Sequence, residues 1–130
     1  MGSMIETENI TDVVETYLAA WNERVPERRR ALVAEVFADD ATYVDPARSG
    51  TGADGIDAMI AGAQEQHPGV ELILAGAPDH HGAHVRFTWH LRPAGTDTVA
   101  MIGHDYASVA PDGRLKDVVG FVEVPEATAA

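Results

Sequence analysis

The sequence predicts an α+β fold in which three helices cover one face of an antiparallel or mixed sheet. In the first half of the chain, apolar residues recur every three to four positions, which is typical of amphipathic helices. In the second half they alternate with polar residues at a period of two, which is typical of strands. Because the helices and most of the strands are separated along the chain, we expect them to form separate layers.

Three segments show an apolar helical face. The first covers residues 10–21. The second begins at Pro26, whose missing N–H is harmless in a first helical turn. We expect the third to be capped by Asp54 and to end at the His-Pro-Gly of residues 67–69. The solvated side of the second helix is expected to carry the arginines, which are Arg24, Arg28, Arg29 and Arg30.

The strands are expected between the second and third helices and after the third. A short strand at residues 41–45 is ended by Pro46. The clearest alternation of apolar and polar residues lies at residues 84–92. Turn sequences separate the later strands, as Pro-Asp-Gly does at residues 111–113. These later strands form an antiparallel meander of residues 70–77, 84–92, 99–109 and 115–124.

Composition and charge predict one globular domain and disfavour two classes of partner. The chain has 130 residues, of which 45% are hydrophobic. We assign residues 1–4 to a cloning remnant, residues 5–124 to the domain and residues 125–130 to a flexible tail. With 21 acidic and 9 basic residues the net charge is −12, so neither nucleic acid nor a membrane is an expected partner. The chain lacks cysteine, a recognisable leader and a long apolar run, so we expect a cytoplasmic protein.

The last two strands carry apolar residues on both faces. In the final strand, Val118 and Val122 alternate with Val119 and Phe121. Helices on one face of the sheet leave the other face uncovered. We therefore expect a homodimer formed through the open face.

Two sequence stretches resemble a known group of proteins. Residues 37–46, Phe-Ala-Asp-Asp-Ala-Thr-Tyr-Val-Asp-Pro, and residues 112–115, Asp-Gly-Arg-Leu, followed by Gly120-Phe121, resemble the nuclear-transport-factor-2-like superfamily and its SnoaL-like members. The likeness extends over nearly the whole chain. It implies a strongly curved sheet that forms a cone-shaped, cystatin-like pocket. This fold hosts isomerases, cyclases, dehydratases, epoxide hydrolases and binding modules, so it does not fix the function.

Ketosteroid isomerase, a member of the superfamily, shares the Asp-Asp-Ala-Thr-x-x-Asp-Pro pattern of residues 39–46. The resemblance implies that Asp45 is a general base, that Tyr17 is an oxyanion-hole tyrosine and that Asp105 is an acid that donates a hydrogen bond while protonated. This chain has Phe37 and Ile60 where the isomerase has supporting tyrosines. It also has Gly120 where the hydrolases and cyclases have an acid.

Our first hypothesis is therefore an enzyme that needs no cofactor and acts beside a carbonyl group. Two carboxyl groups in an apolar pocket can have different roles. The ionised one takes up a proton as a general base, and the neutral one donates a hydrogen bond. Isomerisation of a double bond, or a related cyclisation or dehydration, would follow on a small apolar or carbonyl-bearing molecule. The expected ligand-binding residues are Trp21, Tyr43, Met59, Phe87, Trp89 and Met101.

Other readings remain open. A binding module with the same pocket and no turnover is the main alternative, and an epoxide hydrolase is a weaker one. Asp45 could simply cap the turn before Pro46, and Asp105 could face water or a dimer interface. No metal site is expected, because His80, His81 and His84 fall across a turn and a strand start, and no acidic residue at ligand spacing completes the set.

Overall fold

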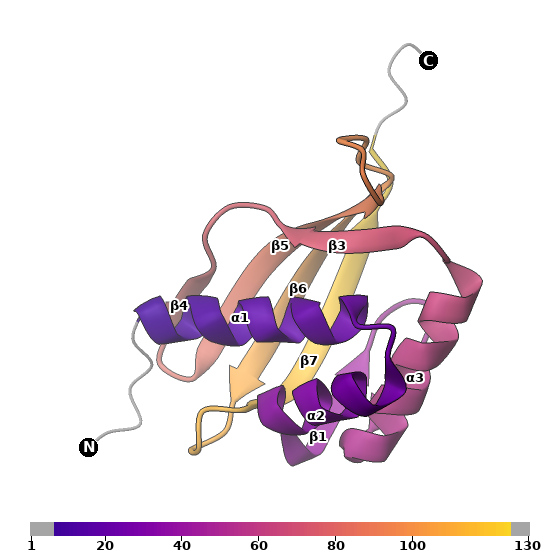
Figure 1. Ribbon diagram of the computed structural model, residues 1–130. Helices are drawn as coiled ribbons and strands as arrows, with labels where there is room; N and C mark the ends of the chain where they lie inside the picture. Colours follow the sequence, from indigo (N-terminus) through magenta and orange to yellow (C-terminus); the bar gives the residue numbers. More distant parts are fainter. Residues whose placement is uncertain (1–6, 126–130) are drawn as a thin grey trace.

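The computed structural model describes residues 7–125 (Figure 1). The expected cloning remnant and residues 126–130 of the expected tail lie outside this range. Within the described range, no helix is both long and apolar enough to cross a membrane. The elements are α1 (Thr7–Asn22), α2 (Pro26–Val36), β1 (Phe37–Val44), β2 (Ser49–Thr51), α3 (Gly52–Gln66), β3 (Val70–Leu74), β4 (Asp79–His81), β5 (His84–Pro93), β6 (Met101–Val109) and β7 (Leu115–Glu123).

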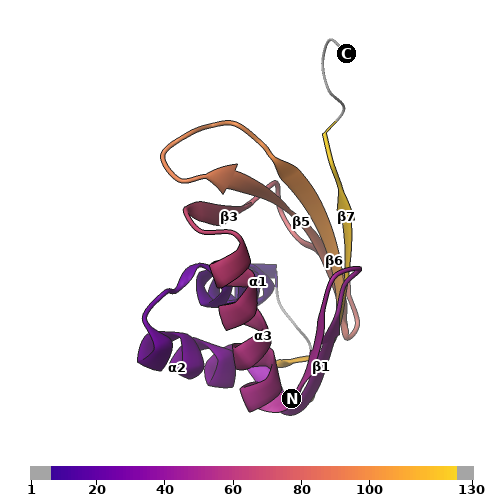
Figure 2. The same cartoon turned by 90° about the vertical axis from the view of Figure 1, so that its right-hand side faces the viewer.

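The strands form one mixed sheet that bends around the helices. Its order is β2-β1-β7-β6-β5-β3, and β4 also pairs with β5. β1 and β7 run parallel, whereas the other described pairs are antiparallel. Figure 2 shows all three helices on the same side of the curved sheet. The predicted fold class is therefore confirmed.

α1 buries its apolar face against the sheet. Ile10, Val14 and Tyr17 are at most 1% exposed, and each such side chain contributes roughly 1.5–3 kcal/mol by leaving water. The Tyr17 ring meets the rings of Phe37 and Phe87 edge-on, with centroids 5.7 and 5.3 Å away. These contacts fix the direction of the tyrosine ring inside the cone.

The arginines do not all lie on a solvated surface as predicted. Arg29 is buried, and its Nε donates to Oδ1 of Asp57 on α3 at 2.8 Å. Removal of one partner of such a pair would leave a buried charge without compensation. The pair therefore joins α2 to α3. Arg24 is exposed as predicted, but it also lines a cavity.

α3 begins earlier than predicted. Thr51 occupies the N-cap position without a side-chain hydrogen bond, and Asp54 lies in the first turn instead of capping it. Gly52 has a φ of 74°, a conformation that other residues adopt at a cost. It allows the chain to leave β2 and enter the helix directly. His67 forms the C-cap, as the sequence indicated.

Two short strands were expected to be turns. β2 and β4 have three residues each. β2 contains Gly50, and β4 consists of one aspartate and two histidines, so neither shows an alternation of apolar and polar residues. Pairing with a neighbouring strand creates them: β2 pairs with β1 and β4 pairs with β5. β1 is longer than predicted because the chain passes from α2 into the strand at Phe37 with no loop.

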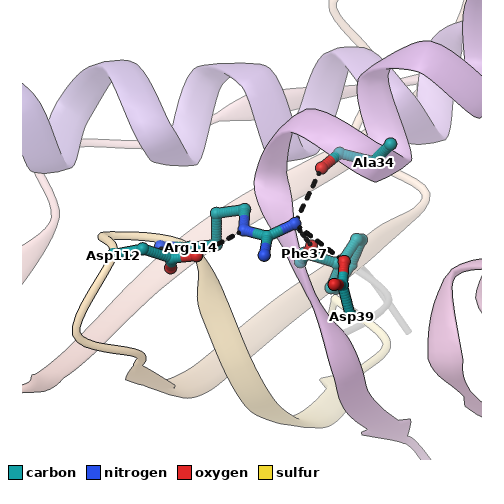
Figure 3. Close-up of polar contacts among 5 residues, drawn as sticks. All are labelled: Ala34, Phe37, Asp39, Asp112 and Arg114. Carbon is teal, nitrogen blue, oxygen red and sulfur yellow. Dashed lines mark hydrogen bonds and ion pairs between the residues drawn. The ribbon is translucent and has the colours of Figure 1, made fainter.

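An arginine at the start of β7 ties the sheet to the junction of α2 and β1 (Figure 3). Nη1 of Arg114 donates to the carbonyl oxygens of Ala34 and Phe37, at 3.2 and 3.1 Å, and pairs with Asp39 at 3.1 Å. Its Nε pairs with Asp112 at 2.9 Å. One planar group thus holds the beginnings of β1 and β7 together.

The convex face of the sheet carries exposed apolar side chains. Val44 lies beside Val119, and Val119 lies beside Tyr106, so the row crosses β1, β7 and β6. Phe121 follows on the same face of β7 and is 57% exposed. The apolar character of both faces, which the sequence indicated, is thus present in the fold.

Trp89 lies flat on its cross-strand neighbour, Gly103. The two residues are paired in the register of β5 and β6. A Cβ atom at position 103 would lie 2.0 Å from the indole ring. The absence of a side chain at Gly103 therefore creates the space that Trp89 fills.

Replacement of Gly103 by alanine is expected to destabilise the fold by about 1–3 kcal/mol, because the new methyl group overlaps the Trp89 ring. Urea unfolding followed by circular dichroism measures this free energy. The control is Gly62→Ala in α3, where nothing lies within 4 Å of the added Cβ atom. That change should stabilise the protein by about 0.5–1 kcal/mol. Equal effects of the two changes would contradict the packing of Trp89 on Gly103.

Candidate functional site

A cavity of about 150 Å³ opens between the helices and the concave face of the sheet. Apolar protein cavities of this size accept a benzene ring. The lining comes from α1 and the segment after it, from the end of α3, from β1 and the loop after it, and from β3, β5, β6 and β7. Its large apolar and aromatic side chains include those of Tyr17, Trp21, Tyr43, Trp89, Leu91 and Met101.

Asp45 lines this cavity and is held by several hydrogen bonds. Oδ1 accepts from the backbone N–H groups of Ala47 and Arg48, at 2.8 and 2.9 Å. Oδ2 accepts from the hydroxyl of Tyr43 at 2.6 Å, and Nη1 of Arg48 lies 3.9 Å away. These donors suit a negatively charged carboxylate. The side chain is only 8% exposed, yet it borders the lumen.

Asp105 forms a second pair with a tyrosine, deeper in the cone. The hydroxyl of Tyr17 donates to its Oδ2 at 2.6 Å, and Asp105 is 2% exposed. Burial raises the pKa of Asp105 to about 6, although the hydrogen bond from Tyr17 lowers this pKa in part. Burial also raises the pKa of Tyr17 well above its ordinary value, and the nearby Asp105 raises it further. The phenol of Tyr17 therefore remains protonated.

The Tyr43–Asp45 pair and the Tyr17–Asp105 pair come together around Gly120. A Cβ atom at this position would lie 2.9 Å from Oδ1 of Asp105, 3.3 Å from Cβ of Asp45 and 3.3 Å from the Tyr43 hydroxyl oxygen. Gly120 is also the register partner of Asp105. Both predicted catalytic acids therefore lie on one side of the sheet, around a position that has no side chain.

The two tryptophans bring further donors to this cluster. The indole N–H of Trp89 faces Asp105 and lowers the pKa of Asp105. The indole N–H of Trp21 faces Tyr17 and lowers the pKa of Tyr17. Neither reaches full hydrogen-bonding geometry, so both Nε1 atoms and Oδ1 of Asp105 are buried without a hydrogen-bond partner. Such atoms are costly in a folded protein.

Three predicted site residues lie outside the cavity lining. Asp105 lies behind the wall, where its contact with the lumen passes through Tyr17. Phe87 is buried against the Tyr17 ring, and Met59 packs at the edge of the core. A pattern of alternation shows which face of an element points inward but not how deep each side chain lies.

The cavity has a polar part that the sequence analysis missed. Arg24, Arg48, Gln64 and His67 all line it. A signal existed for Arg24, because it continues the helical spacing of Tyr17 and Trp21. Arg48 gave no such signal, because its position depends on the turn around Asp45.

No metal centre is evident within residues 7–125. No three of the described His, Asp and Glu side chains lie together in a way that could hold a metal ion. His81 and His84 are register partners with ring centroids 6.1 Å apart.

Comparison with known proteins identifies the family. Residues 14–119 match the model of the SnoaL-like domain. The chain belongs to the SnoaL-like family. Among curated proteins, no match is found. A solved structure from Agrobacterium tumefaciens, described as a proposed isomerase of the SnoaL-like family, is 44% identical with a TM-score of 0.82. The alignment covers 89% of this chain and 98% of that one.

More distant SnoaL-like and related structures share the fold alone. A proposed polyketide cyclase from Sinorhizobium meliloti is 15% identical, with a TM-score of 0.67 and coverage of 89% of this chain and 99% of that one. An NTF2-like protein of unknown function from Exiguobacterium is 18% identical, with a TM-score of 0.67 and coverage of 85% and 98%. The resemblance stated from the sequence is thus confirmed.

Asp105 is expected to make the stability of this SnoaL-like domain depend on pH. Its pKa is 3.8 in an exposed setting and about 6 in the fold, so between these values the folded state binds more protons than the unfolded state. The free energy of unfolding therefore falls as the pH rises through this window. A pKa difference of roughly 2 corresponds to a loss of about 3 kcal/mol.

Urea unfolding of the wild type and of Asp105→Asn at several pH values tests this expectation. The difference between their free energies of unfolding should move in favour of the variant as the pH rises. It should stay constant above about pH 7, where the carboxyl is ionised in both states. A difference that does not change with pH would show that the folded state does not raise this pKa.

Proposed function

We propose that the protein is a cofactor-independent acid–base enzyme that moves a proton beside the carbonyl group of a small, largely apolar molecule. The observation that carries this proposal is the meeting of two tyrosine–aspartate pairs above Gly120, with Asp45 at the cavity. Double-bond isomerisation is the reaction we favour, because a relative of 44% identity is described as a proposed isomerase.

Asp45 would act as the proton carrier. Its Oδ1 is occupied by two backbone donors, whereas Oδ2 accepts from Tyr43 and retains a free lone pair. In the proposed reaction Oδ2 takes the proton from the carbon beside the carbonyl, and the electron pair of that C–H bond forms an enolate. The same oxygen returns the proton to the carbon at the other end of the shifting double bond, so the product is an isomer of the substrate and the enzyme is regenerated.

Tyr17 would stabilise the enolate oxygen, with Asp105 behind it. Tyr17 lines the cavity, and its raised pKa keeps its hydroxyl available as a donor. Protonated Asp105 can donate to the Tyr17 oxygen and so release the phenol hydrogen toward the ligand. The raised pKa of Asp105, about 6, means that the protonated form is well populated only near pH 6 and below, so this role is expected to weaken as the pH rises above 7. Asp105 is then a positioning residue, since it acts through Tyr17.

Asp45→Asn is expected to lower kcat by about 10²–10⁴-fold, because amide oxygen cannot serve as the base. The assay follows the ultraviolet absorbance of the conjugated product from a panel of β,γ-unsaturated cyclic ketones. Asp54→Asn is the matched control, because Asp54 is exposed on α3 and changes the charge equally. Undiminished turnover by Asp45→Asn would refute the assignment of the base.

A binding module remains the second candidate, and one observation favours it. The bonds from the Ala47 and Arg48 N–H groups to Asp45 are those of an ordinary turn-capping aspartate. Saturable binding of an apolar phenol without turnover of any ketone would support this reading. Epoxide opening is less favoured, because Gly120 supplies no acid and its surroundings leave no space for one.

The proposal includes a second copy of the chain on the convex face of the sheet. Val44, Tyr106, Val119 and Phe121 form a continuous apolar surface, each between 38% and 57% exposed. Contiguous apolar surface of this kind commonly marks an interface. A symmetric dimer would bring the same surface of each copy together.

Val119→Asp is expected to convert the dimer to a monomer, because it buries a charge in this interface. Analytical ultracentrifugation at micromolar concentration measures the molecular mass. Val25→Asp is the matched control, because Val25 is 40% exposed but lies between α1 and α2. It should leave the dimer intact. A monomeric wild type would remove the dimer from the proposal.

A further inference from the structure

The charge of the cavity differs from that of the whole chain. The chain has 21 acidic and 9 basic residues. The cavity nevertheless has two arginines and one aspartate in its lining, together with His67. Its mouth is defined by the lining residues that reach solvent, among them Arg24, Arg48, Pro46 and His67. With two arginines against one aspartate, the cavity lining has a positive formal charge on a molecule that is otherwise strongly negative.

Arg24 is held at the mouth without a carboxylate partner among the described residues. Its Nη1 donates to the carbonyl oxygen of Gln64 at 3.3 Å, and its Nη2 donates to that of Val70 at 3.1 Å. Both acceptors are neutral groups at the end of α3 and the start of β3. A guanidinium has five N–H donors, so these contacts orient it and leave donors free.

Arg48 is the second cation of the mouth. Its side chain is 23% exposed, and its Nη2 donates to the neutral amide oxygen of Gln66 at 3.2 Å. Its distance to Asp45, 3.9 Å, is too long for a hydrogen bond. Because Gln64, Gln66 and the C-cap His67 belong to the end of α3, both arginines lie around one helix end.

Three other arginines have a carboxylate partner at close range. Arg86 pairs with Asp79 at 3.1 Å, Arg114 pairs with Asp112 at 2.9 Å, and buried Arg29 pairs with Asp57 at 2.8 Å. The arrangement at the mouth therefore differs from an ordinary surface ion pair. The Arg24 guanidinium is held by neutral acceptors alone, whereas Arg48 combines a neutral acceptor with an ion pair to Asp45 at 3.9 Å, and both keep N–H donors available beside an apolar cavity.

We propose that the ligand of this cavity is an amphipathic carboxylic acid, whose apolar body lies against Trp21 and Trp89 and whose carboxylate is bound by Arg24 and Arg48. Arginine suits this role, because its planar N–H groups match the two oxygens of a carboxylate. The inference rests on the proposed site being a ligand pocket, but not on turnover there. Combined with the proposed reaction, it defines the substrate class as small unsaturated oxo acids.

Calorimetry with two compounds of the same shape tests the inference. The probes are 4-phenylbutanoate and its neutral analogue 4-phenylbutanamide, whose ring matches the size of the cavity. The acid is expected to bind at least about tenfold more tightly, which is the effect of one charge-assisted hydrogen bond. Arg24→Gln should remove most of this preference by weakening binding of the acid much more than binding of the amide. Arg48→Gln should act in the same direction.

Arg28→Gln is the matched control, since Arg28 is exposed on α2, away from the cavity lining, and the loss of charge is the same. It should retain the preference for the acid. Equal binding of acid and amide, no binding of the acid at millimolar concentration, or an equal loss in Arg28→Gln would overturn the inference. Preference for the acid without any ketone turnover would retain the inference and reject the enzyme. Turnover that depends on Asp45, with no preference for the acid, would retain the enzyme and reject the inference.

Discussion

The candidate site depends on the parallel pairing of β1 with β7. In this register Tyr43 lies beside Val118 and Val44 lies beside Val119, so Asp45 comes next to Gly120. Pairing of β7 with β6 on its other side sets Asp105 against the same glycine. Parallel neighbours cannot be joined by a tight turn, and here most of the chain separates them. The hydrogen bonds of Arg114 hold the two strand beginnings together, ahead of an irregularity in the pairing between Phe37 and Thr42.

Much of the fold could be predicted because its elements have strong periodicity. The apolar face of α1 and the alternation in β5 both correspond to buried surfaces. β2 and β4 could not be predicted, because they owe their structure to a neighbouring strand rather than to their own side chains. The start of α3 was misjudged for a similar reason, since strand pairing and the conformation of Gly52 determine it.

The site was harder to predict than the fold. The roles given to Asp45, Asp105 and Tyr17 came from resemblance, and the structure brings these side chains to one region while leaving their chemistry to experiment. The sequence does not show how deep a side chain lies within the cone. Asp105 and Phe87 were therefore expected to line the cavity, although they lie behind its lining. Arg24 was assigned to a solvated surface because, within so acidic a chain, arginine usually marks surface ion pairs, and Arg48 was missed because its position depends on the turn around Asp45.

Two glycines determine the shape of the interior. Trp89 occupies the space that a side chain at Gly103 would fill, and Asp45 and Asp105 surround Gly120. Glycine and alanine codons differ by a single base, so one base change can add a methyl group at Gly103 or Gly120. The first would push an aromatic ring into the lumen, and the second would push the carboxyl groups apart. Variation among relatives at these two positions would therefore reshape the ligand space more than many changes in the visible lining.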